Sequence, residues 1–140
     1  MAYDSDNVFA RILRGELPAH KVYEDADTLA FMDIMPRSQG HALVIPKAPV
    51  RNMLDASEAQ LAACIKTVQK IALAARTAFS ADGITLLQAN EVASGQVVFH
   101  LHFHVMPRWE GKPLGPAATQ MEKPEVLAAN AERLRQALGV

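Results

Sequence analysis

The 140-residue sequence has one cysteine, almost no net charge and no long apolar run. The single Cys64 excludes an intrachain disulfide and suits a reducing compartment. A formal charge of -1, with Lys and Arg dispersed, offers no basic stripe for nucleic acid. No apolar run approaches the roughly 20 residues that span a bilayer, and the acidic start lacks a signal-peptide pattern. We therefore predict a cytoplasmic protein with neither nucleic acid nor a membrane as partner.

The sequence does have three histidines on alternate positions of one apolar run, His100, His102 and His104. Alternate residues of a strand share one face, so this spacing predicts three imidazoles lining one side of a strand. A fourth histidine, His41, stands beside a second apolar run. Imidazole is both a common transition-metal ligand and a nucleophile or general acid/base near neutral pH. Both uses remain open at this point.

The remaining pattern predicts one α+β domain with an antiparallel sheet covered on one face by helices. A capping box at Ser57 and Gln60 opens a long amphipathic helix. A short first helix is expected to begin at an N-cap of Ser5 or Asp6. The triad is expected on the open face of the sheet. Helices are expected at 8–13, from the capping box to 79, and at 127–138, with strands at 21–24, 28–33, 41–46, 84–88 and 97–106.

The run from His100 to Met106 resembles the motif of the HIT, or histidine triad, superfamily of nucleotide hydrolases and transferases, written His-φ-His-φ-His-φ-φ. Further segments are similar to the same family and occur in the same order. They are Gly15-Glu16-Leu17-Pro18-Ala19, Tyr23-Glu24-Asp25, Leu29-Ala30-Phe31, Asp33-Ile34, Gly40-His41, Leu43-Val44-Ile45-Pro46-Lys47, Asn90, Gly95-Gln96 and Pro107-Arg108.

The resemblance implies a HIT-like fold of about five antiparallel strands with a long central helix, a C-terminal helix and a two-fold dimer. The domain would span 1–140, with its core at about 5–110 and a C-terminal loop and helix at 111–140. The implied activity is cleavage of purine nucleoside 5'-monophosphate conjugates through a covalent nucleotidyl-histidine. Phosphoramidates of AMP and diadenosine polyphosphates are the expected substrates.

The resemblance also implies a role for each candidate site residue. His102 would be the nucleophile, oriented by the backbone carbonyl of His100, with His104 on the leaving-group side and His41 in a polar network with His100. Asp33 would bind the ribose hydroxyls. Asn90, the Gly95 N–H and Gln96 would hold the phosphate region, next to Val97, and the purine slot would be formed by Val8, Phe9, Ile12, Phe31 and Ile34.

Each of these residues also has a purely structural interpretation. The apolar ones are typical of a core. Asp33 suits a turn. Asn90 and Gln96 suit loop residues that satisfy backbone groups.

The chain departs from the family pattern at two sites. Many bacterial relatives hold a structural zinc, but the matching positions here are Asn7, Ala10 and Pro49, so we predict no zinc and no other cofactor. Mg²⁺ is expected only as a companion of a dinucleotide substrate. Val97 stands where Hint-type phosphoramidases carry a serine that assists the leaving amine. The sequence therefore leaves the choice between P–N and P–O–P substrates open.

Two other functions compete with this interpretation. In the first, the row of histidines ligates a metal, although the first and third would lie roughly 6.5 to 7 Å apart along a strand. In the second, the protein is a nucleotide-binding regulator whose slow hydrolysis is incidental.

Overall fold

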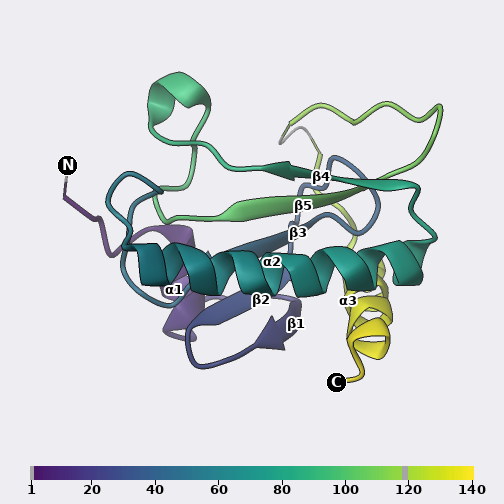
Figure 1. Ribbon diagram of the computed structural model, residues 1–140, viewed down its shortest axis with the longest axis horizontal. Helices are drawn as coiled ribbons and strands as arrows, with labels where there is room; N and C mark the ends of the chain where they lie inside the picture. The colour runs from purple at the N-terminus through teal and green to yellow at the C-terminus, as the bar shows by residue number, and fades with distance from the viewer. Residues whose placement is uncertain (1, 118–119) are drawn as a thin grey trace.

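The computed structural model describes residues 2–117 and 120–140. Figure 1 shows a twisted sheet with the long helix α2 lying across it. The elements in chain order are α1 (Val8–Leu13), β1 (Lys21–Glu24), β2 (Thr28–Met32), β3 (Ala42–Pro46), α2 (Glu58–Phe79), β4 (Gly83–Leu87), the 3-10 turn η1 (Val92–Ser94), β5 (Phe103–Arg108) and α3 (Pro124–Leu138).

The five strands form one antiparallel sheet in the order β1-β2-β3-β5-β4. The predicted α+β class and five-stranded antiparallel sheet are therefore confirmed. β4 pairs with β5, as expected. The register runs from Gly83 opposite Arg108 to Leu87 opposite His104. β1 and β4 are the edge strands, so β4 places one side of its backbone at the rim of the sheet.

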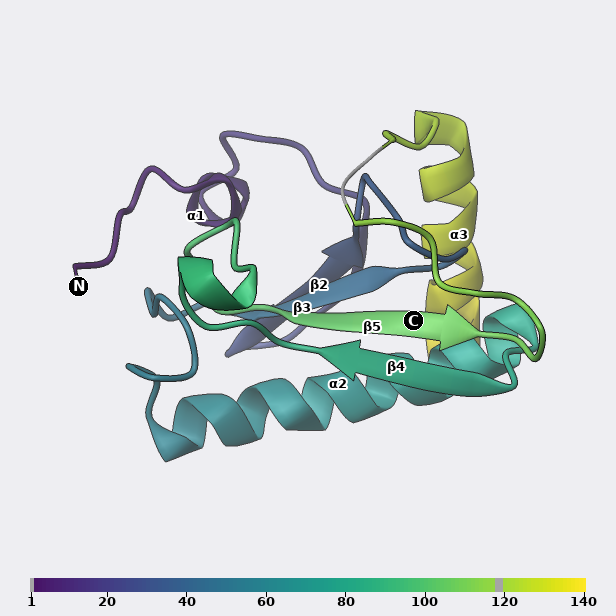
Figure 2. The same cartoon turned by 90° about the horizontal axis from the view of Figure 1, so that it is seen from above.

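The two faces of the sheet are covered differently. Figure 2 shows α2 on one side and the short α1 on the other. Val44 and Val105 belong to the larger core, to which α2 and α3 contribute. Leu43 belongs to a smaller cluster that includes Phe9 of α1. Because Leu43 lies opposite His104 in the register, the His104 side chain is on the α1 face, away from the long helix.

Local sequence accounts for the ends of the helices. Ser57 and Gln60 form the capping box with both of its hydrogen bonds, as predicted. α1 is capped by Asn7 and not by Ser5 or Asp6, because the Asn7 side-chain oxygen accepts from the N–H of Ala10 at 2.9 Å. α3 begins with Pro124, whose ring suits a first helical turn.

The triad strand is shorter than predicted, because β5 begins only at Phe103 and contains His104 but not His100 or His102. The register with β3 ends at Val44 opposite Phe103. Further along, Pro46 has no N–H for a ladder, and its carbonyl accepts from the His100 ring at 2.8 Å. The residues before Phe103 therefore leave the regular sheet, and the triad does not form an even row.

Within the part of the chain that the structure describes, none of the helices combines the length and apolar character required to cross a membrane.

Candidate active site

One ring nitrogen of His102 is fixed by a backbone carbonyl. Nδ1 lies 2.7 Å from the carbonyl oxygen of His100. Because a carbonyl can only accept, Nδ1 carries the proton and Nε2 keeps its lone pair. Burial lowers the pKa of His102, although the hydrogen bond to His100 opposes this effect. The ring is therefore neutral near pH 7 and presents a nucleophilic nitrogen.

His100 uses both ring nitrogens to hold its own position. Nε2 donates to the Pro46 carbonyl at 2.8 Å, so Nδ1 accepts from the Tyr3 hydroxyl at 2.6 Å. The ring is fully buried, and burial lowers the pKa of His100 to about 4. Sequence analysis missed Tyr3, because nothing local connects it with a histidine 97 positions away. Both ring nitrogens of His100 are therefore hydrogen-bonded, while its backbone carbonyl holds His102.

His41 contacts His104 and not His100, which differs from the predicted network. Its Nδ1 accepts from the backbone N–H of Arg37 at 3.0 Å. A backbone N–H can only donate, so the His41 proton is on Nε2, which lies 2.9 Å from Nδ1 of His104. Burial, together with the nearby His104, lowers the pKa of His41 to about 3. The ring is therefore a neutral donor to His104.

His104 inherits its tautomer from this bond. Because its Nδ1 accepts from His41, the neutral ring carries its proton on Nε2. Burial and the neighbouring His102 lower the pKa of His104 to about 4. The rings of His102 and His104 have centroids 5.0 Å apart. The ring with its lone pair on Nε2, His102, and the ring with its N–H on Nε2, His104, are thus neighbours.

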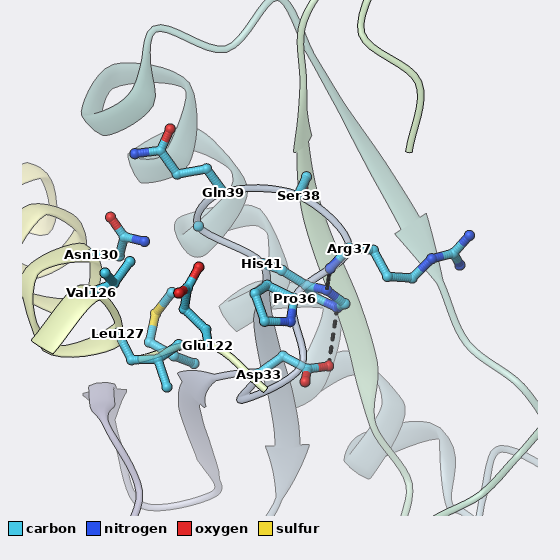
Figure 3. Close-up of a pocket in the computed structure, with 12 residues that line it drawn as sticks. Asp33, Pro36, Arg37, Ser38, Gln39, His41, Glu122, Val126, Leu127 and Asn130 are labelled. Atoms are coloured by element: carbon cyan, nitrogen blue, oxygen red, sulfur yellow. Dashed lines mark hydrogen bonds and ion pairs between the residues drawn. The ribbon is translucent and has the colours of Figure 1, made fainter. Parts of the chain in front are cut away.

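Asp33 follows β2 and combines two roles. Its Oδ1 accepts from the N–H of Met35 at 2.8 Å, which is the turn expected of such a residue. Its Oδ2 lies 3.4 Å from Nε2 of His41. Burial raises the pKa of the Asp33 carboxyl, and the bond from Met35 opposes this rise. The turn fixes one oxygen and leaves the other directed at the histidines, as the dashed line in Figure 3 shows.

Asp33, His41 and His104 bring three potential metal-ligating atoms within 4.8 Å of one another. A metal would need the lone pair of Nε2 on His41. The Arg37 N–H already occupies the lone pair of Nδ1, which places the proton on Nε2. His100 is also unsuitable, because its two nitrogens are engaged by Tyr3 and Pro46. The bonding pattern favours a hydrogen-bonded cluster over a metal centre.

Three polar groups of the loop that precedes the triad are hydrogen-bonded to other parts of the protein or within the loop. The Gly95 N–H donates to the Val92 carbonyl at 3.0 Å. Gln96 is 4% exposed, and its amide bonds to the backbone of Glu91, Arg51 and Val98. Asn90 accepts from the N–H of Met53 at 2.8 Å and also pairs with the Gln88 side chain. These three groups hold the loop and connect it to residues 51–53, and their contact with a phosphate stays a prediction.

A partly buried ion pair stabilises the same loop. Arg51 donates two hydrogen bonds to the Glu91 carboxylate, at 2.8 and 2.9 Å, and Asn52 adds a third at 2.6 Å. Glu91 has a φ of +74° and a ψ of 163°, a conformation that residues other than glycine rarely adopt. The Arg51 guanidinium also lies over the Phe99 ring. Sequence analysis missed this brace, since its partners lie 40 positions apart.

The predicted purine slot divides into buried and exposed parts. The side chains of three members, Phe9, Ile12 and Phe31, are in the smaller core cluster. Val8 and Ile34 are each 47% exposed, and Val97 is 78% exposed. Only these last three offer much surface to a ligand, although Phe9 also meets the His102 ring edge to face at 5.0 Å.

The fold and these paired histidines define a protein of the histidine triad class. Residues 14–111 match the HIT domain family, so the chain belongs to that family. The Protein hit of Bacillus subtilis is 40% identical over 102 residues, 73% of this chain and 70% of its own. The Adenylylsulfatase HINT3 of Arabidopsis thaliana is 41% identical over 106 residues, 76% of this chain and 54% of its own.

Solved structures agree with this assignment. A Hit-like protein of Bartonella henselae, described as involved in cell-cycle regulation, is 53% identical with a TM-score of 0.92, covering 97% of this chain and 99% of that one. A zinc-bound histidine triad protein of Mycobacterium smegmatis is 36% identical with a TM-score of 0.86, covering 96% of this chain and 94% of that one.

Proposed function

We propose that this protein is a cytoplasmic hydrolase or transferase of purine nucleoside 5'-monophosphate conjugates, acting through a nucleotidyl adduct on His102. The observation that carries the proposal is the pairing of tautomers described above. His102 presents a lone pair at Nε2 and His104 presents an N–H at Nε2, with ring centroids 5.0 Å apart. These two groups suit a displacement at phosphorus, because one can attack and the other can donate a hydrogen bond to the leaving atom.

The reaction proceeds in two displacements. In the first, Nε2 of His102 forms a bond to the α-phosphorus, and the bond from phosphorus to the leaving atom breaks. The leaving atom keeps the electron pair, accepts a hydrogen bond from Nε2 of His104 and takes a proton from solvent. In the second, water bonds to phosphorus and loses a proton, while the phosphorus–nitrogen bond breaks and its pair returns to His102. The sum is conjugate plus water giving AMP plus the protonated leaving group.

The rest of the site supports a nucleotide. Oδ2 of Asp33 is an acceptor suited to ribose hydroxyls, and the half-exposed Val8 and Ile34 offer apolar surface to a purine. The substrate remains one of three classes, the phosphoramidates and diadenosine polyphosphates expected from the sequence and the adenylyl sulfate that the name of one relative suggests.

A structural zinc does not fit this chain. The positions that would supply ligands carry Asn7, Ala10 and Pro49, and Asn7 serves as the helix cap. The Tyr3 hydroxyl bonds the one nitrogen of His100 that does not donate to Pro46. We infer that Tyr3 and Asn7 stabilise this corner without a metal, because a structural site needs about four protein ligands.

A homodimer is also part of this proposal. Edge strand β4 carries Leu86, 51% exposed, and the outer side of α2 carries the exposed Ile65 and Leu73. An unpaired strand edge beside exposed apolar side chains favours pairing with a second copy.

The test compares native protein with His102→Ala, using His20→Ala as a control for a histidine outside the site. Each is mixed with adenosine 5'-phosphoramidate, a diadenosine polyphosphate or adenylyl sulfate, and AMP release is followed. We expect His102→Ala to lose roughly 10⁴-fold or more in kcat, and a quenched native sample to show an added AMP by intact mass. Turnover retained in His102→Ala would refute the covalent mechanism.

A further inference from the structure

The C-terminal segment beyond Gly111 lies outside the residues that match the family, yet it is bonded to the loop that carries Asp33 and His41. We call residues 33–41 the catalytic loop. The Gly115 N–H donates to the Arg37 carbonyl at 2.8 Å, and Nε of Arg37 donates back to the Gly115 carbonyl at 2.9 Å. We call this two-way pair of bonds the clip. A third bond runs from the Glu122 N–H to the Ile34 carbonyl at 2.9 Å.

Side-chain packing does little to support the catalytic loop on this side. A cavity of about 360 Å³ separates it from α3. Figure 3 shows Val126, Leu127 and Asn130 on the helix side of this space, with the Arg37 side chain extending away from it. The buried Ser38 hydroxyl has no hydrogen-bond partner among the described residues. Since a cavity supplies no contact energy, the two bonds of the clip and the bond from Glu122 attach the loop on this side.

The clip also depends on a close approach of two backbones. A Cβ built on Gly115 would lie 3.1 Å from the carbonyl oxygen of Arg37, which is tighter than ordinary contact. Glycine therefore allows the segment to reach Arg37 without moving the loop.

We propose that Arg37 is a positioning residue. The clip to Gly115 holds the Arg37 backbone N–H on Nδ1 of His41. The His41 ring in turn keeps the Nε2–H of His104 directed at the leaving atom. The chain of bonds is continuous from Gly115 to Arg37, His41 and His104. The catalytic part of this inference rests on the proposed function, because it assigns His104 to the leaving atom. The structural part, the tautomer of the two rings, does not.

A charge effect acts in the same direction. The Arg37 guanidinium contributes to the lowered pKa of His41 and of His104, after burial and the neighbouring imidazoles. A neutral His104 is the form that keeps its Nδ1 available to His41. Arg37 therefore acts on both the position and the protonation of this pair.

The test replaces Arg37 with Met, which removes the charge and the Nε donor, and with Lys, which keeps a cationic donor. The matched control is Arg135→Met, since Arg135 also donates to a backbone carbonyl, that of Lys21, but in the last turn of α3. Ring ¹⁵N shifts from NMR report the tautomers directly. We expect a single Nε2–H tautomer for His41 and His104 in the native protein, a mixture in Arg37→Met, and recovery in Arg37→Lys.

Kinetics with two leaving groups give an independent measurement. For Arg37→Met we expect kcat to fall roughly tenfold to a hundredfold with adenosine 5'-phosphoramidate. With the p-nitrophenyl ester of AMP, whose leaving group needs little help, kcat should change less than twofold, and KM should change little for both.

The outcomes separate the two proposals. Native ¹⁵N shifts in Arg37→Met, or an equal loss of kcat for both leaving groups, would overturn the role of Arg37. If the native protein cleaves no nucleotide conjugate, the proposed function fails, and the tautomers still decide whether the clip orders the rings.

If Arg37→Met does not fold, Gly115→Ala is used, since it presses a methyl on the Arg37 carbonyl and keeps the guanidinium. The same mixture of tautomers is then expected.

Discussion

The pair His100 and His102 is held by backbone carbonyls, whereas the pair His41 and His104 is held from a backbone N–H. The carbonyls of Pro46 and His100 accept hydrogen bonds from the rings of His100 and His102, so each of these rings donates to the backbone. The Arg37 backbone N–H donates to His41, and His41 donates to His104, so each of these rings accepts a hydrogen bond at Nδ1. The same side chain, equally neutral, therefore presents a lone pair at one position and an N–H at the other. Whether the backbone group bonded to each pair is an acceptor or a donor decides which ring nitrogen carries the proton.

The two pairs also depend on different parts of the chain. The first is completed by Tyr3 near the N-terminus, and the second by the catalytic loop and the segment around Gly115. Variants in one part should therefore change one ring polarity and not the other, which makes the comparison testable.

The largest loss of activity in the second pair is expected from His104→Ala. Removing the Nε2–H leaves the lone pair of His102 in place but removes the donor to the leaving atom. We expect kcat to fall roughly 10²- to 10³-fold with the phosphoramidate, and much less with the p-nitrophenyl ester. Steady-state AMP release measures both, and His104→Gln, which keeps an N–H donor, should recover part of the loss. An equal loss on both esters would place His104 elsewhere in the mechanism.

A second effect, on stability, comes from pH, which should act on all the buried rings. Burial lowers the pKa of His41 to about 3 and of His100 and His104 to about 4, so the unfolded chain takes up protons first as the pH falls. The free energy of unfolding should be highest above about pH 6.5 and fall toward pH 4, by up to roughly 1.4 kcal/mol per pH unit for each ring.

Urea unfolding at a series of pH values measures this slope. His41→Gln should make it shallower by removing one buried ring. A free energy of unfolding that is constant between pH 6.5 and 4.5 would show that the rings are not held neutral.

The smallest effect is expected at the first pair, from Tyr3→Phe. Loss of the hydroxyl leaves Nδ1 of buried His100 without its donor, which should cost about 1 to 3 kcal/mol of stability. The carbonyl that orients His102 is unchanged, so kcat should fall less than about tenfold. Chemical denaturation and AMP release provide the two measurements. Tyr23→Phe, which removes a hydroxyl bonded to Asp25, is the matched control and should leave kcat unchanged. A tautomer change at His104 in Tyr3→Phe would contradict the independence of the pairs.

The sequence predicted those features that depend on neighbours along the chain. The capping box of Ser57 and Gln60, the long helix and the five strands follow from local periodicity and turn residues. The start of β5 at Phe103 was not predicted, because it depends on how Pro46 meets His100 across the sheet.

Within the site, the histidines were found by their spacing, and the bond of His102 to the His100 carbonyl agrees with the family resemblance, but the other partners were not predicted. The bond from Arg37 to His41 needs the loop to close on itself, and that from Tyr3 to His100 joins residues 97 positions apart. Gly95 bonds within its own loop, whereas Gln96 also reaches the carbonyl of Arg51, a partner that the sequence did not indicate. Tertiary contacts of this kind leave no periodic signal in a sequence.

The brace at Glu91 has a consequence for how this sequence can evolve. Its backbone conformation is one that glycine adopts without strain, while its carboxylate holds Arg51 and Asn52. A change to glycine would relieve the backbone and leave the guanidinium of Arg51 without its ion-pair partner. A substitution at position 91 should therefore be tolerated mainly when position 51 changes as well. The two positions are expected to covary among homologous sequences.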